Sequence, residues 1–111
     1  MDLTIKTLEA YLFHLYGSQG KEQGLFMKLI EEIGEVAEIL NMRSGAKAAS
    51  GEDMQSDLAK ELADVIHYAV AIAAVNGIDL SETIISKDRK ASAKYHHDVD
   101  LETFMCRESA G

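Results

Sequence analysis

The sequence contains no proline and no tryptophan, and cysteine occurs only once, at Cys106. Because proline breaks or kinks helices, a chain without it can form long uninterrupted ones. A single cysteine excludes a disulfide within the chain and suits a reducing compartment, so we expect a cytoplasmic protein. The N-terminal stretch MDLTIKTLEAYLF has an early acid and no long uncharged run, and it does not have the pattern of a signal peptide.

Basic residues are also scarce, with 11 Lys and Arg against 19 Asp and Glu and a formal net charge of −8. This balance argues against non-specific binding to nucleic acid or to anionic membranes, because both require basic patches. A small anionic ligand stays compatible with it, since bound cations can reverse the local charge. No uncharged run is long enough to span a bilayer, so we expect no membrane segment.

The chain of 111 residues fits one domain covering residues 1–111. Its apolar residues are mostly Leu, Ile and Ala, which favours helices over strands. Periodic apolar residues predict helices over residues 3–16, 21–43, 54–76 and 80–95. Between them we expect a turn at GSQG (17–20), a polar loop over 43–53, and an irregular acidic tail from about residue 96 with a possible docking segment, LETFM.

Local signals support these boundaries. Thr4 is placed to cap the first helix, Gly77 to end the third, and Asp79 with Glu82 forms a capping box for the fourth. After Leu62 the third helix is apolar almost all round, which is typical of a helix buried on every side. Three amphipathic neighbours give too little cover for it, so the sequence predicts an all-α, four-helix-bundle-like fold completed by oligomerisation.

The second helix carries four carboxylates, Glu31, Glu32, Glu35 and Glu38, in LIEEIGEVAEIL. At about 100° per residue they fall within an arc of roughly 120°. The opposite side is an apolar stripe formed by Leu25, Leu29, Ile33, Val36 and Leu40. Acids opposite an apolar stripe usually form a solvated face, and this helix alone predicts no more than that.

The third helix adds Glu61 and Asp64, which are three residues apart and share a face. Burying carboxylates costs several kcal/mol without a counter-charge, and Lys60 is the last cation before Lys87. If the two helices bring their acids together, a divalent cation between them would remove the repulsion. Oxygen ligands without cysteine favour Mg²⁺, with Mn²⁺ as a possible substitute.

The two acidic motifs, EEIGE at 31–35 and ELAD at 61–64, resemble the signature of the MazG-like, all-α nucleoside triphosphate pyrophosphohydrolases. GEVAEIL, ELADVIHYAVAIAAVNGIDLSETIISK and KYHHD extend the similarity over roughly residues 25–95, nearest to the dCTP pyrophosphatase branch. The resemblance implies Mg²⁺-dependent hydrolysis of (deoxy)nucleoside triphosphates to monophosphate and pyrophosphate, as dNTP house-cleaning with a possible preference for dCTP. It also implies a homo-oligomer, with a tetramer favoured over a dimer.

The resemblance assigns roles position by position. It implies the metal ligands Glu32, Glu35, Glu61 and Asp64, and Glu31 as the acid that orients or activates the attacking water. It places Lys87 near the phosphates, where Lys90 and Lys94 follow at helical spacing, and Tyr68 near the sugar or triphosphate. The tryptophans that flank the base in the dCTP branch are absent here, and Phe13, His14 and Tyr16 are candidates to replace them.

Other interpretations remain open at this stage. The protein could be a non-catalytic helical oligomer that binds nucleotide or a protein partner, with its acids intact but no turnover. Tyr68 could be an ordinary core tyrosine, and the lysines could be surface charge. His67 follows Asp64 by three residues, as in di-iron carboxylate bundles, but no second such motif is present.

Overall fold

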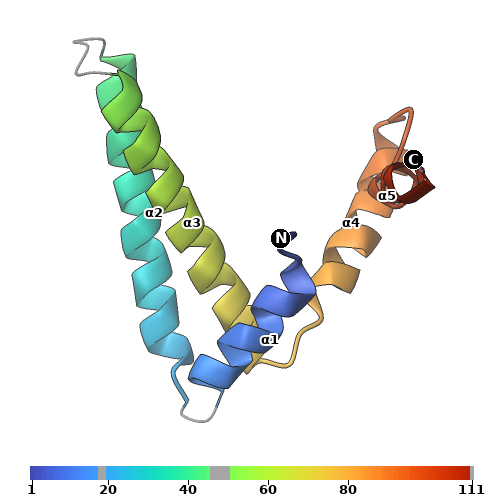
Figure 1. The fold of residues 1–111 in the computed structure, drawn as a ribbon, viewed down its shortest axis with the longest axis horizontal. Helices are drawn as coiled ribbons and strands as arrows, with labels where there is room; N and C mark the ends of the chain where they lie inside the picture. Colours follow the sequence, from blue (N-terminus) through green and yellow to red (C-terminus); the bar gives the residue numbers. More distant parts are fainter. Residues whose placement is uncertain (18–19, 46–50, 111) are drawn as a thin grey trace. The chain divides into compact units, whose positions relative to one another are not determined.

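The computed structural model describes residues 1–17, 20–45 and 51–110. These ranges contain five α-helices and no strand, so the all-α prediction is confirmed. The helices are α1 (Ile5–Tyr16), α2 (Glu22–Ser44), α3 (Gly51–Val75), α4 (Leu80–Lys94) and α5 (Leu101–Ala110) (Figure 1). The chain packs as two compact units, Met1–Ile78 and Asp79–Gly111. Whether residues 1–111 act as one domain stays a prediction.

The four predicted helices are present with small shifts at their ends. The loop predicted over 43–53 is shorter than expected, because α2 continues to Ser44 and α3 already begins at Gly51. Residues 46–50 of that loop and 18–19 of the predicted turn lie outside the described residues.

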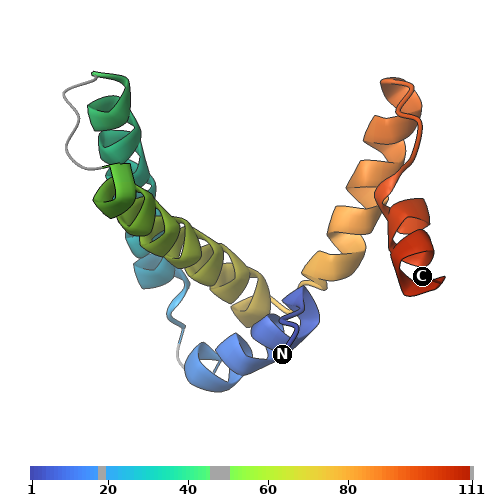
Figure 2. The same ribbon diagram turned by 45° about the horizontal axis from the view of Figure 1, so that its top comes forward.

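In the first unit α2 and α3 lie side by side and antiparallel, and α1 packs against α3 near its C-terminal end (Figures 1 and 2). Asn76, just after α3, donates a 2.8 Å hydrogen bond from Nδ2 to Glu22 Oε1 at the start of α2. The core is small and lies mostly where α1 meets the last turns of α3. Its buried apolar residues are Leu12, Leu25, Met54, Val70, Ala71, Ala73 and Ala74.

The predicted caps are confirmed. The Thr4 hydroxyl accepts from the Thr7 amide at 3.1 Å, and the Asp79 carboxylate accepts from the Glu82 amide at 3.1 Å. Gly77 adopts φ +67° after α3. The amide of Gly77 donates to the Ala74 carbonyl, and the amide of Ile78 donates to the Ala73 carbonyl. These two hydrogen bonds form a Schellman motif.

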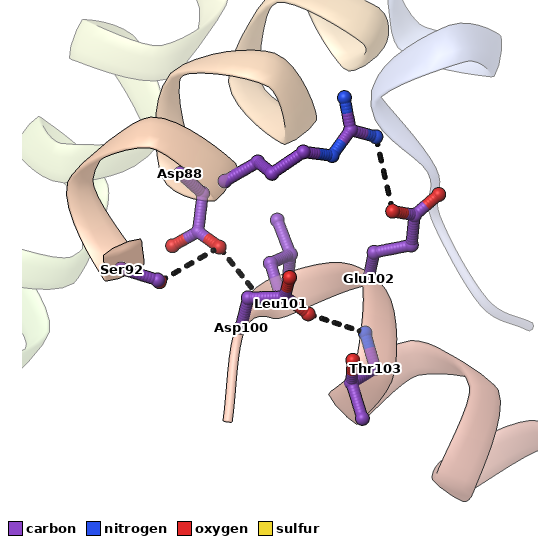
Figure 3. A network of polar contacts seen from close by, with 7 residues as sticks. Asp88, Ser92, Asp100, Leu101, Glu102 and Thr103 are labelled. Carbon is purple, nitrogen blue, oxygen red and sulfur yellow. Dashed lines mark hydrogen bonds and ion pairs between the residues drawn. The ribbon is translucent and has the colours of Figure 1, made fainter. Parts of the chain in front are cut away.

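The prediction of an irregular tail was wrong, because residues 101–110 form α5, which packs on α4 in the second unit. Carboxylates hold its first turn (Figure 3). Asp88 Oδ2 accepts from the Leu101 amide at 2.6 Å, and Asp100 Oδ1 accepts from the Thr103 amide at 2.8 Å. Arg89 and Glu102 form an ion pair at 3.0 Å. Asp88 and Arg89 of α4 supply two of these contacts, and the sequence pattern does not indicate them.

No helix in the described part of the chain is both long and apolar enough to cross a membrane.

Candidate metal centre

Two carboxylates occupy positions in the α2–α3 interface where an apolar residue would be expected. On α2 the residues turned inward recur at heptad spacing as Leu25, Leu29, Glu32, Val36 and Ile39, all buried or half-buried. On α3 the corresponding inward row is Met54, Leu58, Glu61, Val65, Tyr68, Ile72 and Val75. Such rows are the contact seam of an antiparallel helix pair, so the helix packing itself buries Glu32 and Glu61.

Glu32, Glu61 and Asp64 form one cluster across this seam. One carboxylate oxygen from each residue lies within 4.8 Å of the others. Glu32 is 8% exposed, Glu61 is half-buried and Asp64 is exposed at the edge. Three carboxylates at this distance repel one another strongly unless a proton or a cation lies between them.

Positive charge would stabilise this cluster, as the pKa of Glu32 and the surroundings of Glu61 indicate. The pKa of Glu32 is raised from 4.5 to about 7, first by a hydrogen bond shared with the Glu61 carboxyl, then by burial and by the charges of Glu61 and Asp64. Glu61 Oε2 is buried without a hydrogen-bond partner. An unpartnered buried carboxylate oxygen is costly in a protein, and a bound cation removes that cost.

The donor set therefore fits a hard divalent cation. All three groups supply carboxylate oxygens, which Mg²⁺, Mn²⁺ and Ca²⁺ prefer, and the cluster contains no histidine or cysteine. His67 instead lies within hydrogen-bond distance of the Tyr16 hydroxyl, with its Nε2 2.9 Å away. This contact leaves the di-iron interpretation of His67 without support.

The other predicted acids lie outside the three-residue cluster. Glu35 is exposed on α2, one turn beyond Glu32. Glu31 is also exposed and accepts a 3.2 Å hydrogen bond from Lys28 Nζ, which raises the pKa of Lys28. The ligand role of Glu35 and the catalytic role of Glu31 therefore stay predictions.

Aromatic residues stand beside the cluster on α1 and α3. Tyr68 is half-buried one turn beyond Asp64, and the His67 ring meets it edge-on with centroids 4.8 Å apart. His67 also meets Tyr16 edge-on, at 5.8 Å. Burial, followed by the nearby Tyr68 and Tyr11, raises the pKa of Tyr16. The predicted base platform on α1 is accessible, because Phe13 is 53% exposed and His14 is exposed.

The predicted phosphate-binding lysines belong to the second unit. Lys87, Lys90 and Lys94 are all exposed on α4, and Lys94 Nζ lies 5.3 Å from the centre of the Tyr95 ring. Their role toward a phosphate stays a prediction.

Lys28 and the contact between Tyr16 and His67 were not predicted from the sequence. Lys28 precedes Glu31 by three residues and Glu32 by four, a spacing that places it on the same side of the helix as both acids. That spacing was a usable signal. The Tyr16–His67 contact joins residues 51 positions apart, and no local pattern indicates it.

Known proteins resemble this chain in sequence and in fold. The MazG nucleotide pyrophosphohydrolase domain family matches residues 21–98, which include α2, α3 and α4. The chain is 37% identical over 68 residues to dCTP pyrophosphatase 1 of Rattus norvegicus and 36% identical over 69 residues to that of Mus musculus. Each match covers 59% of this chain and 40% of the relative. The chain thus spans well under half the length of these two relatives.

A solved structure gives the same result for the fold. The crystal structure of iMazG from Vibrio DAT 722 superposes with a TM-score of 0.63 at 29% sequence identity. The match covers 84% of this chain and 98% of the Vibrio chain. With its two acidic helices packed as a pair, the chain belongs to the MazG nucleotide pyrophosphohydrolase domain family.

Proposed function

We propose that the protein hydrolyses nucleoside triphosphates to nucleoside monophosphate and pyrophosphate, using Mg²⁺ held by Glu32, Glu61 and Asp64. The observation that carries this proposal is the carboxylate cluster with its buried, unpartnered Glu61 oxygen. Glu32 and Glu61 occupy interface positions where apolar side chains would pack better. An acidic face that only meets solvent would not need carboxylates at these positions. The family membership supplies the reaction class.

The chain's own residues supply the framework for this chemistry. Glu32 and Glu61 hold their carboxylates rigidly, because both project from the seam of two long packed helices. Asp64 lies exposed at the opening of the cluster, where a substrate can approach. When bound, the divalent cation supplies positive charge against the triphosphate and the pyrophosphate leaving group. Glu35, one turn from Glu32 on the same helix, would be the fourth ligand.

Glu31 is our candidate for the general base. It is exposed and adjacent in sequence to a buried ligand, and only its Oε2 atom is paired with Lys28, so its other oxygen can accept a proton from an attacking water molecule. The attack would fall on the α-phosphorus, in line with the departing pyrophosphate.

We also propose a deoxynucleotide as the substrate, with dCTP the first to test, because the two mammalian relatives are named for that activity. Phe13 and His14 offer an exposed aromatic face for the base, and Tyr68 a hydroxyl for the sugar or triphosphate. Lys87, Lys90 and Lys94 would add positive charge for the phosphates.

A homo-oligomer, with a tetramer favoured, is part of the same proposal. Besides its inward row, α2 carries a second apolar row that faces solvent, and α3 adds to it. Its exposed members are Phe26, Ile30, Ile33 and Leu40 on α2 and Leu62 and Ile66 on α3. Contiguous exposed apolar rows usually mark an interface. Light scattering after gel filtration should give a dimer or tetramer, and Ile33→Glu should dissociate it; a monomeric wild type would contradict this part.

The activity is tested by incubating the protein with each dNTP and NTP in Mg²⁺ and separating the products. We expect monophosphate and pyrophosphate, and about 10²-fold or greater loss of kcat in Asp64→Asn, since the charge of a ligand is removed. Glu38→Gln, an exposed acid on α2, serves as the matched control and should keep full activity. Nucleotide binding without any turnover in the wild type would instead favour the non-catalytic oligomer.

A further inference from the structure

A lysine stands directly beside the acidic cluster, on the same helix as Glu31 and Glu32. Lys28 Nζ lies 3.2 Å from Glu31 Oε2, in a pair whose side chains are 46% and 58% exposed. At about 100° per residue, Lys28 points between the directions of Glu31 and Glu32. Its positive charge also reaches Glu32, where it opposes the rise of that carboxyl's pKa.

This position gives Lys28 a role that its surface exposure alone would not suggest. The cluster carries three carboxylates, so a fourth at Glu31 is repelled by its neighbours and free to rotate into solvent. A cation one turn earlier attracts Glu31 and restricts its rotamers. As an ion pair for stability the contact is worth little, because exposed pairs contribute well under 1 kcal/mol. Restricting the direction of a carboxylate that reacts with water can raise the reaction rate without changing the free energy of unfolding.

We propose that Lys28 is a positioning residue for the reaction: its ammonium group holds the Glu31 carboxylate at the edge of the cluster, where that carboxylate receives the proton of the attacking water. The inference rests on the proposed function, because it assigns Lys28 a role through Glu31. Lys28 itself takes no proton and forms no bond with the substrate.

The test combines kinetics with a double-mutant cycle. Lys28→Met should lower kcat about tenfold while KM changes less than twofold, because the misdirected base still exists but is seldom aligned. Lys28→Arg keeps the cation and should recover most of the loss. In a Glu31→Gln background the Lys28→Met change should have no further effect on kcat. Lys21→Met, a lysine just before α2, is the control and should leave both constants unchanged.

A second readout does not depend on turnover. In ¹⁵N-correlated NMR of the lysine ammonium groups, Glu31→Gln should shift the Lys28 resonance, and Glu38→Gln should not. Titration with Mn²⁺ should give equal or slightly tighter binding in Lys28→Met, because a nearby positive charge has been removed.

Several results would overturn the inference. An unshifted Lys28 resonance in Glu31→Gln would show that the pair does not form. An equal loss of kcat from Lys28→Met with and without Glu31 would show that Lys28 does not act through it. A rise in KM with unchanged kcat would make Lys28 a substrate contact instead. A wild type that hydrolyses no nucleotide overturns the proposed function together with this role, whereas an active wild type with normal Lys28→Met overturns this role alone.

Discussion

Replacing Glu61 by Gln should stabilise the metal-free protein and remove its response to Mg²⁺. Glu61 Oε2 is buried without a partner and lies among the oxygens of Glu32 and Asp64. The amide of Gln has nearly the same shape, carries no charge, and can donate to the Glu32 carboxylate. In EDTA at pH 8 the variant therefore lacks the charge repulsion with Glu32 and Asp64, and the buried side chain at position 61 gains a hydrogen bond.

The magnitude follows from the cost of an unsatisfied buried polar group, which is about 1–3 kcal/mol. We expect the free energy of unfolding of Glu61→Gln to rise by about 1–2 kcal/mol, or several degrees in Tm for a chain of this size. Bound Mg²⁺ should reverse this order of stability between wild type and variant. A ligand at 100 times its Kd stabilises the wild type by about 2.7 kcal/mol, so with saturating Mg²⁺ the wild type should exceed the variant by about 1 kcal/mol.

The assay is urea or thermal unfolding at fixed protein concentration, with EDTA or with a series of Mg²⁺ concentrations. Glu38→Gln removes an exposed acid from α2 and should follow the wild type in both conditions. A Glu61→Gln variant less stable than wild type in EDTA, or a wild-type Tm that Mg²⁺ leaves unchanged, would contradict the prediction.

The pKa of Glu32, the Tyr16–His67 contact and the backbone angle of His96 each give a further prediction. Because the pKa of Glu32 is raised from 4.5 to about 7, the folded metal-free protein retains a proton that the unfolded chain releases. Its free energy of unfolding should therefore fall as pH rises from about 4.5 to 7. Urea midpoints in EDTA measure this, and a flat profile would contradict it. Tyr16→Phe removes the 2.9 Å contact with half-buried His67 and should lower the free energy of unfolding by about 1 kcal/mol, measured in urea; an unchanged midpoint would show that the contact contributes nothing. His96 has φ +58°, a conformation in which glycine is favoured. His96→Gly should therefore raise the free energy of unfolding by about 0.5–1 kcal/mol, measured by thermal unfolding, and an unchanged or lower Tm would contradict this.

The helices were predictable because their signals are local. Apolar periodicity and caps at Thr4, Gly77 and Asp79 depend on residues within a few positions of each other, and all are present in the structure. Helix α5 was missed although Asp100 caps it locally through the Thr103 amide; the second carboxylate of its first turn, Asp88, lies thirteen residues before Leu101. A contact of that range requires the fold of α4 and α5 to be known first.

The apolar stripe of the second helix was only partly correct. We expected Leu25, Leu29 and Val36 to share one face with Ile33 and Leu40. The structure turns the first three inward and leaves Ile33 51% and Leu40 47% exposed. With two adjacent apolar rows on one helix, composition does not determine which row packs against α3.

From the sequence alone we could predict helices α1 to α4, the acidic residues on α2 and α3, and the family signature that these acids form. These follow from residue type and spacing, which are local properties. Which of these acids lie together depends on how the helices pack. The packing of α2 on α3 places Glu32 and Glu61 in the seam with Asp64 at its edge, and it leaves Glu31 outside beside Lys28. The rotation of one helix against another depends on all the side chains of the interface together, and that choice turns acidic residues into a candidate metal centre.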